Sequence, residues 1–367
     1  MNAPASAPAQ KPCDSHGILV QCRPGFEPDA GRELEQRALA ARLGGKLESR
    51  SNSGFVIFRF NTPEARDGVQ RKLDLARLVF SRQGFHLVAQ LGQLPEKDRL
   101  TPLLDAAQQC GTRFSALLPE TPDTNEGKER SGFLRRFVPL FEKALGEAGL
   151  LQADAPHLPR LHLFFSSATE CALGLSQGSE GSSWPMGIPR LRFPKDAPSR
   201  STLKLAEAFI ALLTPEEQKS TLRAGLQAVD LGASPGGWTW QLVSRGMRVS
   251  CIDNGPMAPQ VHATGLIEHL RVDGFTWKPR KTVEWMVCDM IEQPARIAPL
   301  MAEWIIGNRC RRSIFNLKLP MKQRHAELER CIGLIDAKMK AVGIKYTLRI
   351  KHLYHDREEV TCYLARR

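Results

Sequence analysis

The sequence predicts an α/β protein with a doubly wound, mostly parallel sheet in the C-terminal half, preceded by two small α+β units. From about Pro189 onward, short apolar strands alternate with helix-like stretches, which is typical of parallel strands joined by crossover helices. The predicted strands span residues 226–232, 248–253, 283–290, 312–320 and 358–367. A segment rich in Gly, Ser and Pro, residues 176–189, precedes this half and marks a boundary.

The N-terminal half contains two shorter α+β patterns. Residues 17–23 and 53–60 are strand-like, and the helix predicted over 28–44 ends at a pair of glycines. Further along, phenylalanines and leucines recur at helical spacing over 132–149, and two strands follow over 160–176. We therefore predict five segments: a disordered Pro- and Ala-rich tail (1–15), two α+β domains (16–94 and 95–178), a linker (179–200) and the C-terminal α/β domain (201–367).

Composition limits the class of protein. No run of apolar residues is long enough for a transmembrane helix, and the N-terminus lacks the apolar core of a signal peptide. The nine cysteines are odd in number and no two are spaced Cys-x-x-Cys, which argues against a zinc knuckle or a disulfide framework. We expect a cytoplasmic protein that does not contact membranes.

The net charge of +12 is unevenly distributed along the chain. From Met186 onward there are 29 Lys and Arg against 18 Asp and Glu, a balance of +11, whereas the preceding residues carry +1. A one-sided positive field favours a polyanionic partner, most simply nucleic acid. The alternative is a basic enzyme that binds no nucleic acid.

The stretch "VDLGASPGGWTW", residues 229–240, has the pattern strand, glycine turn, helix. Ligands of open α/β sheets bind beyond the carboxyl ends of the strands, and glycines let the backbone approach them closely. Asp253 ends the next predicted strand, where a carboxylate reaches the hydroxyls of a bound ribose. The alternative is a tight turn that serves packing alone.

A dinucleotide fits this turn poorly. Ser234 stands where the fingerprint G-x-G-x-x-G has its second glycine, and Pro235 stiffens the turn. S-adenosylmethionine carries no phosphate, so the proline is less awkward for it.

Other strand ends carry polar residues. Asp289 follows one apolar strand, and Lys318 ends another within "IFNLKLP". Lys204 lies on the helix before the glycine turn, and Glu358 and Glu359 begin the last strand. If Lys318 is buried, its pKa should fall toward neutrality, which would suit a general base.

The set Lys204, Asp289, Lys318 and Glu359, together with "DLGASPGGW", resembles the K-D-K-E ribose 2′-O-methyltransferases of the FtsJ-like group. The segments "CRPGFE", "LGASPGGWTWQLV", "NLKLPMK" and "HDREEVT" are similar to the bacterial family of large-subunit rRNA methyltransferases M. That resemblance implies a Rossmann-like methyltransferase domain, preceded by a ferredoxin-like domain and a THUMP RNA-binding domain. It also implies methylation of a cytidine ribose 2′-hydroxyl in the peptidyl-transferase region of 23S rRNA.

The resemblance assigns roles to individual residues. Lys318 is the expected base, Lys204 and Glu359 hold the ribose and tune Lys318, and Asp289 orients the lysine pair. S-adenosylmethionine is the expected cofactor, and no metal is required. The expected cofactor contacts are Ser201, Ser234, Pro235, Gly236, Gly237, Asp253, Asp273 and Asp289. From the residues alone, Asp273 in "RVDGF" would equally be a turn former.

Three basic segments are candidate RNA contacts near Lys318. They are Arg190, Arg192, Lys195 and Arg200 before the methyltransferase domain, Arg309, Arg311 and Arg312 before the lysine strand, and Lys322 and Arg324 after it. The expected partner is 23S rRNA or an assembly precursor of the large subunit, bound by a monomer. The choice between Glu358 and Glu359 stays open. So do three alternatives: methylation of another RNA, methylation of a small molecule, and an assembly factor with an inactive methyltransferase fold.

Overall fold

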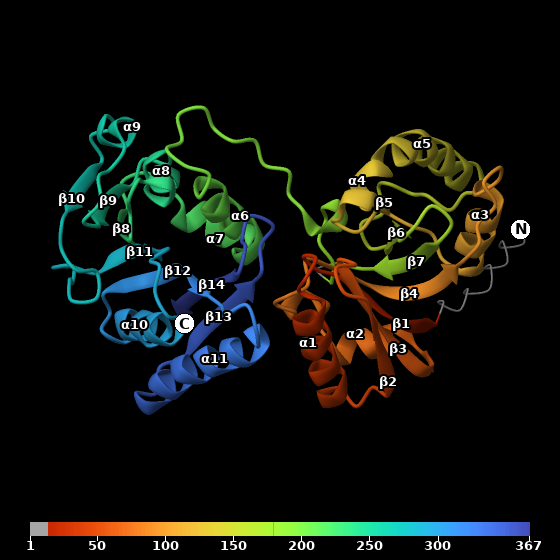
Figure 1. Ribbon diagram of the computed structural model, residues 1–367, viewed down its shortest axis with the longest axis horizontal. Helices are drawn as coiled ribbons and strands as arrows, with labels where there is room; N and C mark the ends of the chain where they lie inside the picture. Colours follow the sequence, from red (N-terminus) through yellow and green to blue (C-terminus); the bar gives the residue numbers. More distant parts are fainter. Residues whose placement is uncertain (1–13, 179) are drawn as a thin grey trace, which may run out of the picture. The chain divides into compact units, whose positions relative to one another are not determined.

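The computed structural model describes residues 14–178 and 180–367, so the predicted disordered tail lies outside it up to Cys13. Ser15, the last residue assigned to that tail, is instead buried and begins the first strand. The chain divides into two compact units, one ending at Ile188 and one beginning at Pro189 (Figure 1). Each unit is built on its own sheet.

The first unit contains a sheet of seven strands in the order β2-β3-β1-β4-β7-β6-β5 among its described residues. β5 and β6 pair in parallel, and the other neighbours are antiparallel. The strands are β1 (Ser15–Gln21), β2 (Gly45–Ser49), β3 (Phe55–Glu64), β4 (Gln83–Leu91), β5 (Ala116–Glu120), β6 (Arg160–Phe165) and β7 (Cys171–Ser176). Because β4 pairs with β7, the sheet runs without a break across the predicted domain boundary at residue 94.

The helices of the first unit are α1 (Glu27–Ala40), α2 (Arg66–Lys72), α3 (Leu100–Gln109), α4 (Asn125–Glu129) and α5 (Ser131–Glu147), with short 3-10 turns η1 (Leu75–Arg77) and η2 (Pro185–Gly187). The phenylalanines at helical spacing on α5 are in the core: Phe137 and Phe141 pack with Phe165 of β6 and Leu103 of α3. The amphipathic pattern therefore predicted the buried positions Phe137, Phe141 and Leu145 correctly, whereas Leu140, which it also included, is 59% exposed.

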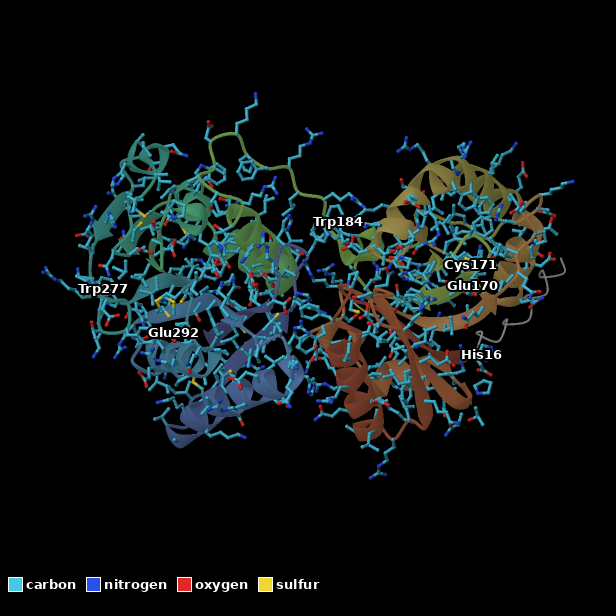
Figure 2. All side chains as sticks on the ribbon, viewed as in Figure 1. His16, Glu170, Cys171, Trp184, Trp277 and Glu292 are labelled. Carbon is cyan, nitrogen blue, oxygen red and sulfur yellow. The ribbon has the colours of Figure 1, made fainter. Side chains whose placement is uncertain are left out.

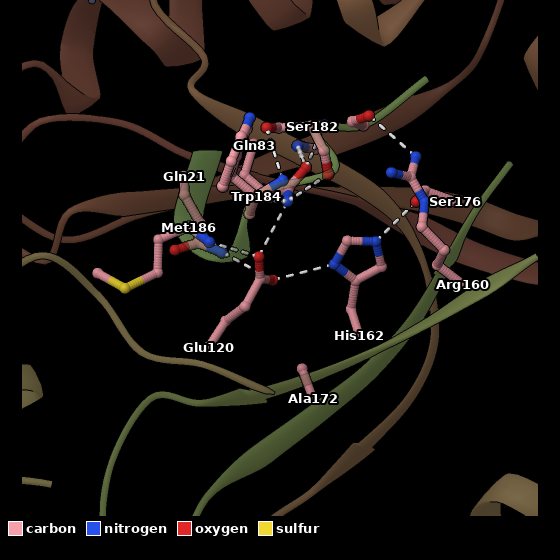
Figure 3. Close-up of polar contacts among 12 residues, drawn as sticks. Gln21, Gln83, Glu120, Arg160, His162, Ala172, Ser176, Ser182, Trp184 and Met186 are labelled. Carbon is pink, nitrogen blue, oxygen red and sulfur yellow. Dashed lines mark hydrogen bonds and ion pairs between the residues drawn. The ribbon is translucent and has the colours of Figure 1, made fainter. Parts of the chain in front are cut away.

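A buried carboxylate joins the strands of the first unit to its last segment (Figure 3). Glu120, at the end of β5, is fully buried. Its oxygens accept hydrogen bonds from Gln21 on β1 (3.0 Å), Gln83 on β4 (2.9 Å) and the backbone of Met186 (2.6 Å). His162 Nδ1 on β6 lies 3.0 Å from the same carboxylate. The segment that leads out of the first unit is thus fixed to the sheet by residues far apart in sequence.

The second unit has a sheet in the order β10-β9-β8-β11-β12-β14-β13. The first five strands in this order are parallel, and β14 is antiparallel to both β12 and β13. The strands are β8 (Gln227–Leu231), β9 (Arg248–Ile252), β10 (Ile267–Leu270), β11 (Val283–Cys288), β12 (Cys310–Lys318), β13 (Tyr346–Lys351) and β14 (Glu359–Arg366). This is the doubly wound sheet that the alternating pattern predicted.

The connecting helices of the second unit are α6 (Thr202–Leu212), α7 (Pro215–Thr221), α8 (Gly237–Val243), α9 (Pro259–His262), α10 (Pro294–Ile306) and α11 (Arg324–Ala341). Leu205 and Phe209 of α6 and Trp238 of α8 pack against the sheet through Trp285 and Val287 of β11. Across the described residues, none of the helices combines the length and the apolar character that a membrane span needs.

The Glu120 cluster leads to a stability prediction. Replacing Glu120 by Ala removes the acceptor of several buried donors, and orphaned buried polar groups are costly. We expect Glu120→Ala to lower the free energy of unfolding of the first unit by roughly 3–5 kcal/mol, measured by denaturant titration. Glu142→Ala, which removes an exposed carboxylate from α5, is the matched control and should cost little. Equal stabilities of the two variants would contradict the structural role of Glu120.

Candidate active site

The polar residues predicted from strand ends gather at one edge of the second sheet. β8, β9, β11 and β12 are neighbours and parallel, so their carboxyl ends lie side by side. The chain runs outward from β8 to β10 and then returns to β11 on the other side of β8. This reversal between β8 and β11 is a topological switch point, where ligands of such sheets bind.

Asp289, immediately after β11, bridges two lysines. Its Oδ1 accepts a hydrogen bond from Lys318 Nζ, and its Oδ2 lies 3.8 Å from Lys204 Nζ. The carboxylate is 18% exposed, and the two lysine side chains are 25% and 16% exposed. One carboxylate thus holds two amines from different elements in a partly dry site.

Glu359 completes this group from the start of β14. Its Oε1 accepts a hydrogen bond from Lys204 Nζ, and it is the cross-strand partner of Lys318. Glu358 instead forms an ion pair with Arg324 at 2.6 Å, on a side chain that is 44% exposed. The structure therefore brings Lys204, Asp289, Lys318 and Glu359 together, and of the two glutamates it is Glu359 that contacts a lysine of this cluster.

Electrostatic interactions decide the protonation states of Lys204 and Glu359. Burial alone would lower the pKa of Lys204, but Asp289 and Glu359 outweigh it and the pKa is raised. Burial works to raise the pKa of Glu359, yet the hydrogen bond from Lys204 and the charges of both lysines lower it. Lys204 and Glu359 therefore form an ion pair that persists at neutral pH.

The glycine turn between β8 and α8 is tightly packed. Gly236 has φ +110°, a conformation that favours glycine. A Cβ on Gly237 would collide with the hydroxyls of Ser199 and Ser201. The Thr202 hydroxyl also donates to the Gly237 carbonyl at 3.0 Å. The start of α6, which carries Lys204, is thereby held against the turn, so packing is one physical reason for these glycines.

Comparison with known proteins agrees with this geometry. Residues 15–85 match the family model of the RlmM ferredoxin-like domain, residues 98–177 that of the N-terminal region of ribosomal RNA large subunit methyltransferase M, and residues 197–320 that of the FtsJ-like methyltransferases. Ribosomal RNA large subunit methyltransferase M of Thauera aminoaromatica is 53% identical, over 95% of this chain and 96% of its own length. The protein of the same name from Aromatoleum aromaticum is 50% identical over 99% of both chains.

The chain belongs to the ribosomal RNA large subunit methyltransferase M family. It is therefore an enzyme, and the predicted family and α/β fold are confirmed. The FtsJ-like match ends at residue 320 and does not reach Glu359, so the place of this glutamate in the cluster comes from the structure.

In this methyltransferase, Asp253 lies after β9 and beside the glycine turn. Its Oδ2 accepts a hydrogen bond from Ser234 N (3.0 Å) and its Oδ1 one from Gly255 N (2.7 Å). Each carboxylate oxygen has a second lone pair, and the residue is only partly buried. These residues fit the ribose of an adenosyl cofactor, because Asp253 is fixed by the backbone and still has capacity for two hydroxyls.

The remaining predicted cofactor residues have structural contacts of their own. The Ser234 hydroxyl donates to the Pro256 carbonyl at 2.8 Å, and Ser201 lies 2.7 Å from the Ser199 hydroxyl. Asp273 is exposed, and its Oδ1 accepts a hydrogen bond from Phe275 N at 2.9 Å, as a turn former does. A contact with the cofactor remains a prediction for all three.

One basic segment that was expected near Lys318 does not lie there. Sequence analysis puts Arg309, Arg311 and Arg312 near Lys318, but these arginines lie at the amino end of β12 and Lys318 at its carboxyl end. Six residues of extended strand separate Arg312 from Lys318 by roughly 20 Å. Arg311 and Arg312 are also paired with Glu284, at 3.5 and 2.8 Å. Closeness in sequence was misleading because the two ends of one strand lie on opposite sides of the sheet, one with the amino ends of the parallel strands and one with their carboxyl ends.

The other two basic segments are compatible with a position beside the cluster. Arg200 lies two residues before α6, and Lys322 and Arg324 follow shortly after Lys318. Arg324 is partly neutralised by Glu358, which leaves Lys322 the more available charge after the lysine strand.

Cysteines and histidines form no metal site among the described residues. The eight described cysteines are free and buried, and Cys171 on β7 is an example (Figure 2). His355 has its Nδ1 2.6 Å from Glu207.

Sequence analysis missed several polar residues behind the cluster. Asn316 Nδ2 donates to Asp289 Oδ1 at 2.9 Å, and Thr361 and Asp356 extend this contact into the core. The sequence could have indicated Asn316, because it lies two residues before Lys318 and strand side chains at this spacing lie on the same face. Asp356 lies in a loop, where the sequence offers no such periodicity.

Asp230 on β8 is also a buried acid, and its pKa leads to a prediction about stability and pH. Burial raises its pKa from 3.8 to about 7, although the Thr239 hydroxyl donates to it. Between these two values the native state binds more protons than the unfolded state, so the free energy of unfolding should fall as pH rises and level off above about pH 7. Asp230→Asn should remove a slope of up to about 1.4 kcal/mol per pH unit.

Denaturant titrations from pH 4.5 to 8, on the order of one per half unit, would measure this slope. Glu268→Gln, an exposed carboxyl of the same unit, is the control and should leave the slope in place. If the free energy of unfolding of Asp230→Asn still fell with pH by the same slope, another group would be responsible for the proton uptake.

Proposed function

We propose that this methyltransferase transfers the methyl group of S-adenosylmethionine to the ribose 2′-hydroxyl of a cytidine in 23S rRNA. The observation that carries the proposal is the bridge that Asp289 makes between Lys204 and Lys318 at the carboxyl edge of the sheet. The names of its relatives support ribosomal RNA of the large subunit as the substrate. The excess of +11 from Met186 onward supports a polyanionic substrate for the catalytic unit.

S-adenosylmethionine, when bound, supplies a methyl group on a positively charged sulfur, which is released as a neutral thioether. We assign Asp253 to the ribose of this cofactor, since its carboxylate retains free lone pairs beside the glycine turn. Gly236 and Gly237 form the turn that lets the backbone approach it. Ser234 would fix the distance between this turn and Asp253.

The lysines have different roles in this proposal. Lys204 is hydrogen-bonded to Glu359 and remains an ammonium, so it would bind the ribose oxygen and stabilise negative charge as it develops. Lys318 is the more exposed of the two and accepts the 2′-hydroxyl proton in its neutral form. The cation of Lys204 disfavours a second positive charge on Lys318.

Asp289 positions both amines. In the structure its Oδ1 accepts a hydrogen bond from Lys318, and its Oδ2 lies 3.8 Å from Lys204 Nζ. Holding the hydroxyl, the amine and the methyl group in line would supply much of the acceleration.

The cofactor assignment predicts a binding defect. Asp253→Ala should remove hydrogen bonds between a carboxylate and two ribose hydroxyls and loosen the Ser234 turn. Hydrogen bonds to charged groups contribute about 1.5–3 kcal/mol each, so affinity for S-adenosylmethionine should fall at least about tenfold. Calorimetric titration measures this, with Glu268→Ala, an exposed carboxylate on β10, as the control. Unchanged affinity of Asp253→Ala would refute the assignment.

The base assignment predicts a defect in chemistry and not in binding. Lys318→Ala should lower the single-turnover rate of methyl transfer to 23S rRNA by roughly 10²–10⁴ and leave cofactor affinity intact. Lys318→Arg should not restore the rate, because a guanidinium does not deprotonate at these pH values. Lys345→Ala, an exposed lysine of the same unit, is the control. A near-normal rate for Lys318→Arg would show that only positive charge is needed at this position.

A further inference from the structure

A chain of buried hydrogen bonds runs from Asp289 into the core of the second unit. Asn316 Nδ2 donates to Asp289 Oδ1 at 2.9 Å, and Asn316 Oδ1 accepts from the Thr361 hydroxyl at 2.8 Å. The Thr361 oxygen also lies 3.0 and 3.2 Å from the two carboxyl oxygens of Asp356. Asn316, Thr361 and Asp356 are each at most 1% exposed.

The number of available protons decides which group donates in each of these hydrogen bonds. The Asp289 carboxylate only accepts, so Asn316 must present its amide N–H₂ to it and its carbonyl oxygen to Thr361. Thr361 must then donate its one hydroxyl proton to Asn316. That proton is no longer available to Asp356, so the short contact between Thr361 and Asp356 is a hydrogen bond only if Asp356 donates.

We propose that Asn316 is the positioning residue of this active site, and that Asp356 holds it in place as a neutral, protonated acid through the Thr361 hydroxyl. The inference rests on the proposed function for its catalytic meaning. Its structural part, a protonated carboxyl at Asp356, stands without it. If Asp356 were ionised, Thr361 would donate to it. The Asn316 carbonyl oxygen would then face either the Thr361 oxygen with no proton between them or, after the amide turned, the Asp289 carboxylate.

The charges around Asp356 are consistent with a neutral acid. Burial raises the pKa of Asp356 well above its usual range, and the carboxylates of Glu359 and Glu207 add to the rise. A hydrogen bond from Leu353 N (3.0 Å to Oδ2) and the charge of Lys204 act in the opposite direction. The Lys204 amine, however, is already bound to Glu359.

The loop that carries Asp356 is fixed to the helix that carries Lys204. Glu207, three residues after Lys204 on α6, accepts hydrogen bonds from the backbone of Tyr354 (2.8 Å) and His355 (3.0 Å). On the other side, Asn316 and Thr361 are cross-strand partners of β12 and β14, as are Lys318 and Glu359. The buried hydrogen bonds therefore join Asp289 to β12 and β14, and Glu207 joins α6 to the loop that carries Asp356.

This arrangement has a chemical consequence for the lysine. Asn316 and Lys318 donate to the same oxygen of Asp289. A donor from Asn316 draws electron density from that oxygen and weakens its hold on the lysine proton. Asn316 would thus both fix the rotamer of Asp289 and lower the cost of forming neutral Lys318.

Three substitutions test which group donates in each of these hydrogen bonds. Thr361→Val removes the hydroxyl in a similar shape and should lower the single-turnover rate at least about tenfold. Thr361→Ser keeps the hydroxyl, and Asp356→Asn keeps both an acceptor for Leu353 N–H and a donor for Thr361, so each should lose less than about threefold. Thermal unfolding and affinity for S-adenosylmethionine, measured on all three, separate a positioning effect from a folding defect.

The pH–rate profile distinguishes positioning from a merely structural role. Because the base acts in its neutral form, the single-turnover rate should rise with pH. Thr361→Val, which frees Asn316 from its place beside Asp289, should move that rise to higher pH. An Asp356→Asn enzyme as slow as Thr361→Val, or a Thr361→Val profile lowered equally at every pH, would overturn the proposal.

Infrared spectroscopy tests the protonation without any activity. At neutral pH the spectrum of the wild-type chain minus that of Asp356→Asn should contain a carboxylic acid C=O band, since the band of Asp230 is common to both and cancels. Absence of this difference band would overturn the inference. If the wild-type chain methylated no rRNA, the proposed function would fail while the infrared band would still decide the state of Asp356.

Discussion

The geometry of this active site depends on one carboxylate, Asp289, holding two lysines that come from separate elements, α6 and β12. Two ammonium groups that contact the same carboxylate repel each other. Only a nearby opposite charge, or the loss of one proton, stabilises such a pair. Asp289 and Glu359 supply that opposite charge. The arrangement needs the strand order of this sheet, because β11, β12 and β14 must be adjacent for their ends to meet. The glycine turn contributes too, since it holds the start of α6 and hence Lys204 in position.

Much of this organisation could be predicted from the sequence, for a physical reason. Parallel strands buried on both faces give short apolar runs, and their polar carboxyl-terminal neighbours must share one edge of the sheet. That is why the predicted strand ends and their polar residues pointed to Asp253, Asp289 and Lys318. The contact between Lys204 and Glu359 spans 155 positions. A family resemblance suggested the pair, and the structure decides between Glu358 and Glu359.

What the sequence did not predict was non-local. The pairing of β4 with β7 continues one sheet across the two predicted domains, and nothing in either strand specifies the other as its partner. Arg311 and Arg312 were placed by distance along the sequence, whereas an extended strand turns a short separation in sequence into a long one in space. Asp356 is in a loop whose position depends on Glu207, so neither period nor motif marked it.

The central claim is that this cluster methylates a ribose oxygen and not a base. The direct measurement is to incubate the chain with S-adenosylmethionine labelled in the methyl group and unmethylated 23S rRNA, and to digest the product completely with alkali. A 2′-O-methyl group blocks cleavage of the adjacent phosphodiester, so the account predicts that the label is recovered in alkali-resistant dinucleotides with cytidine on the 5′ side. Label released in mononucleotides would place the methyl group on a base and contradict the account.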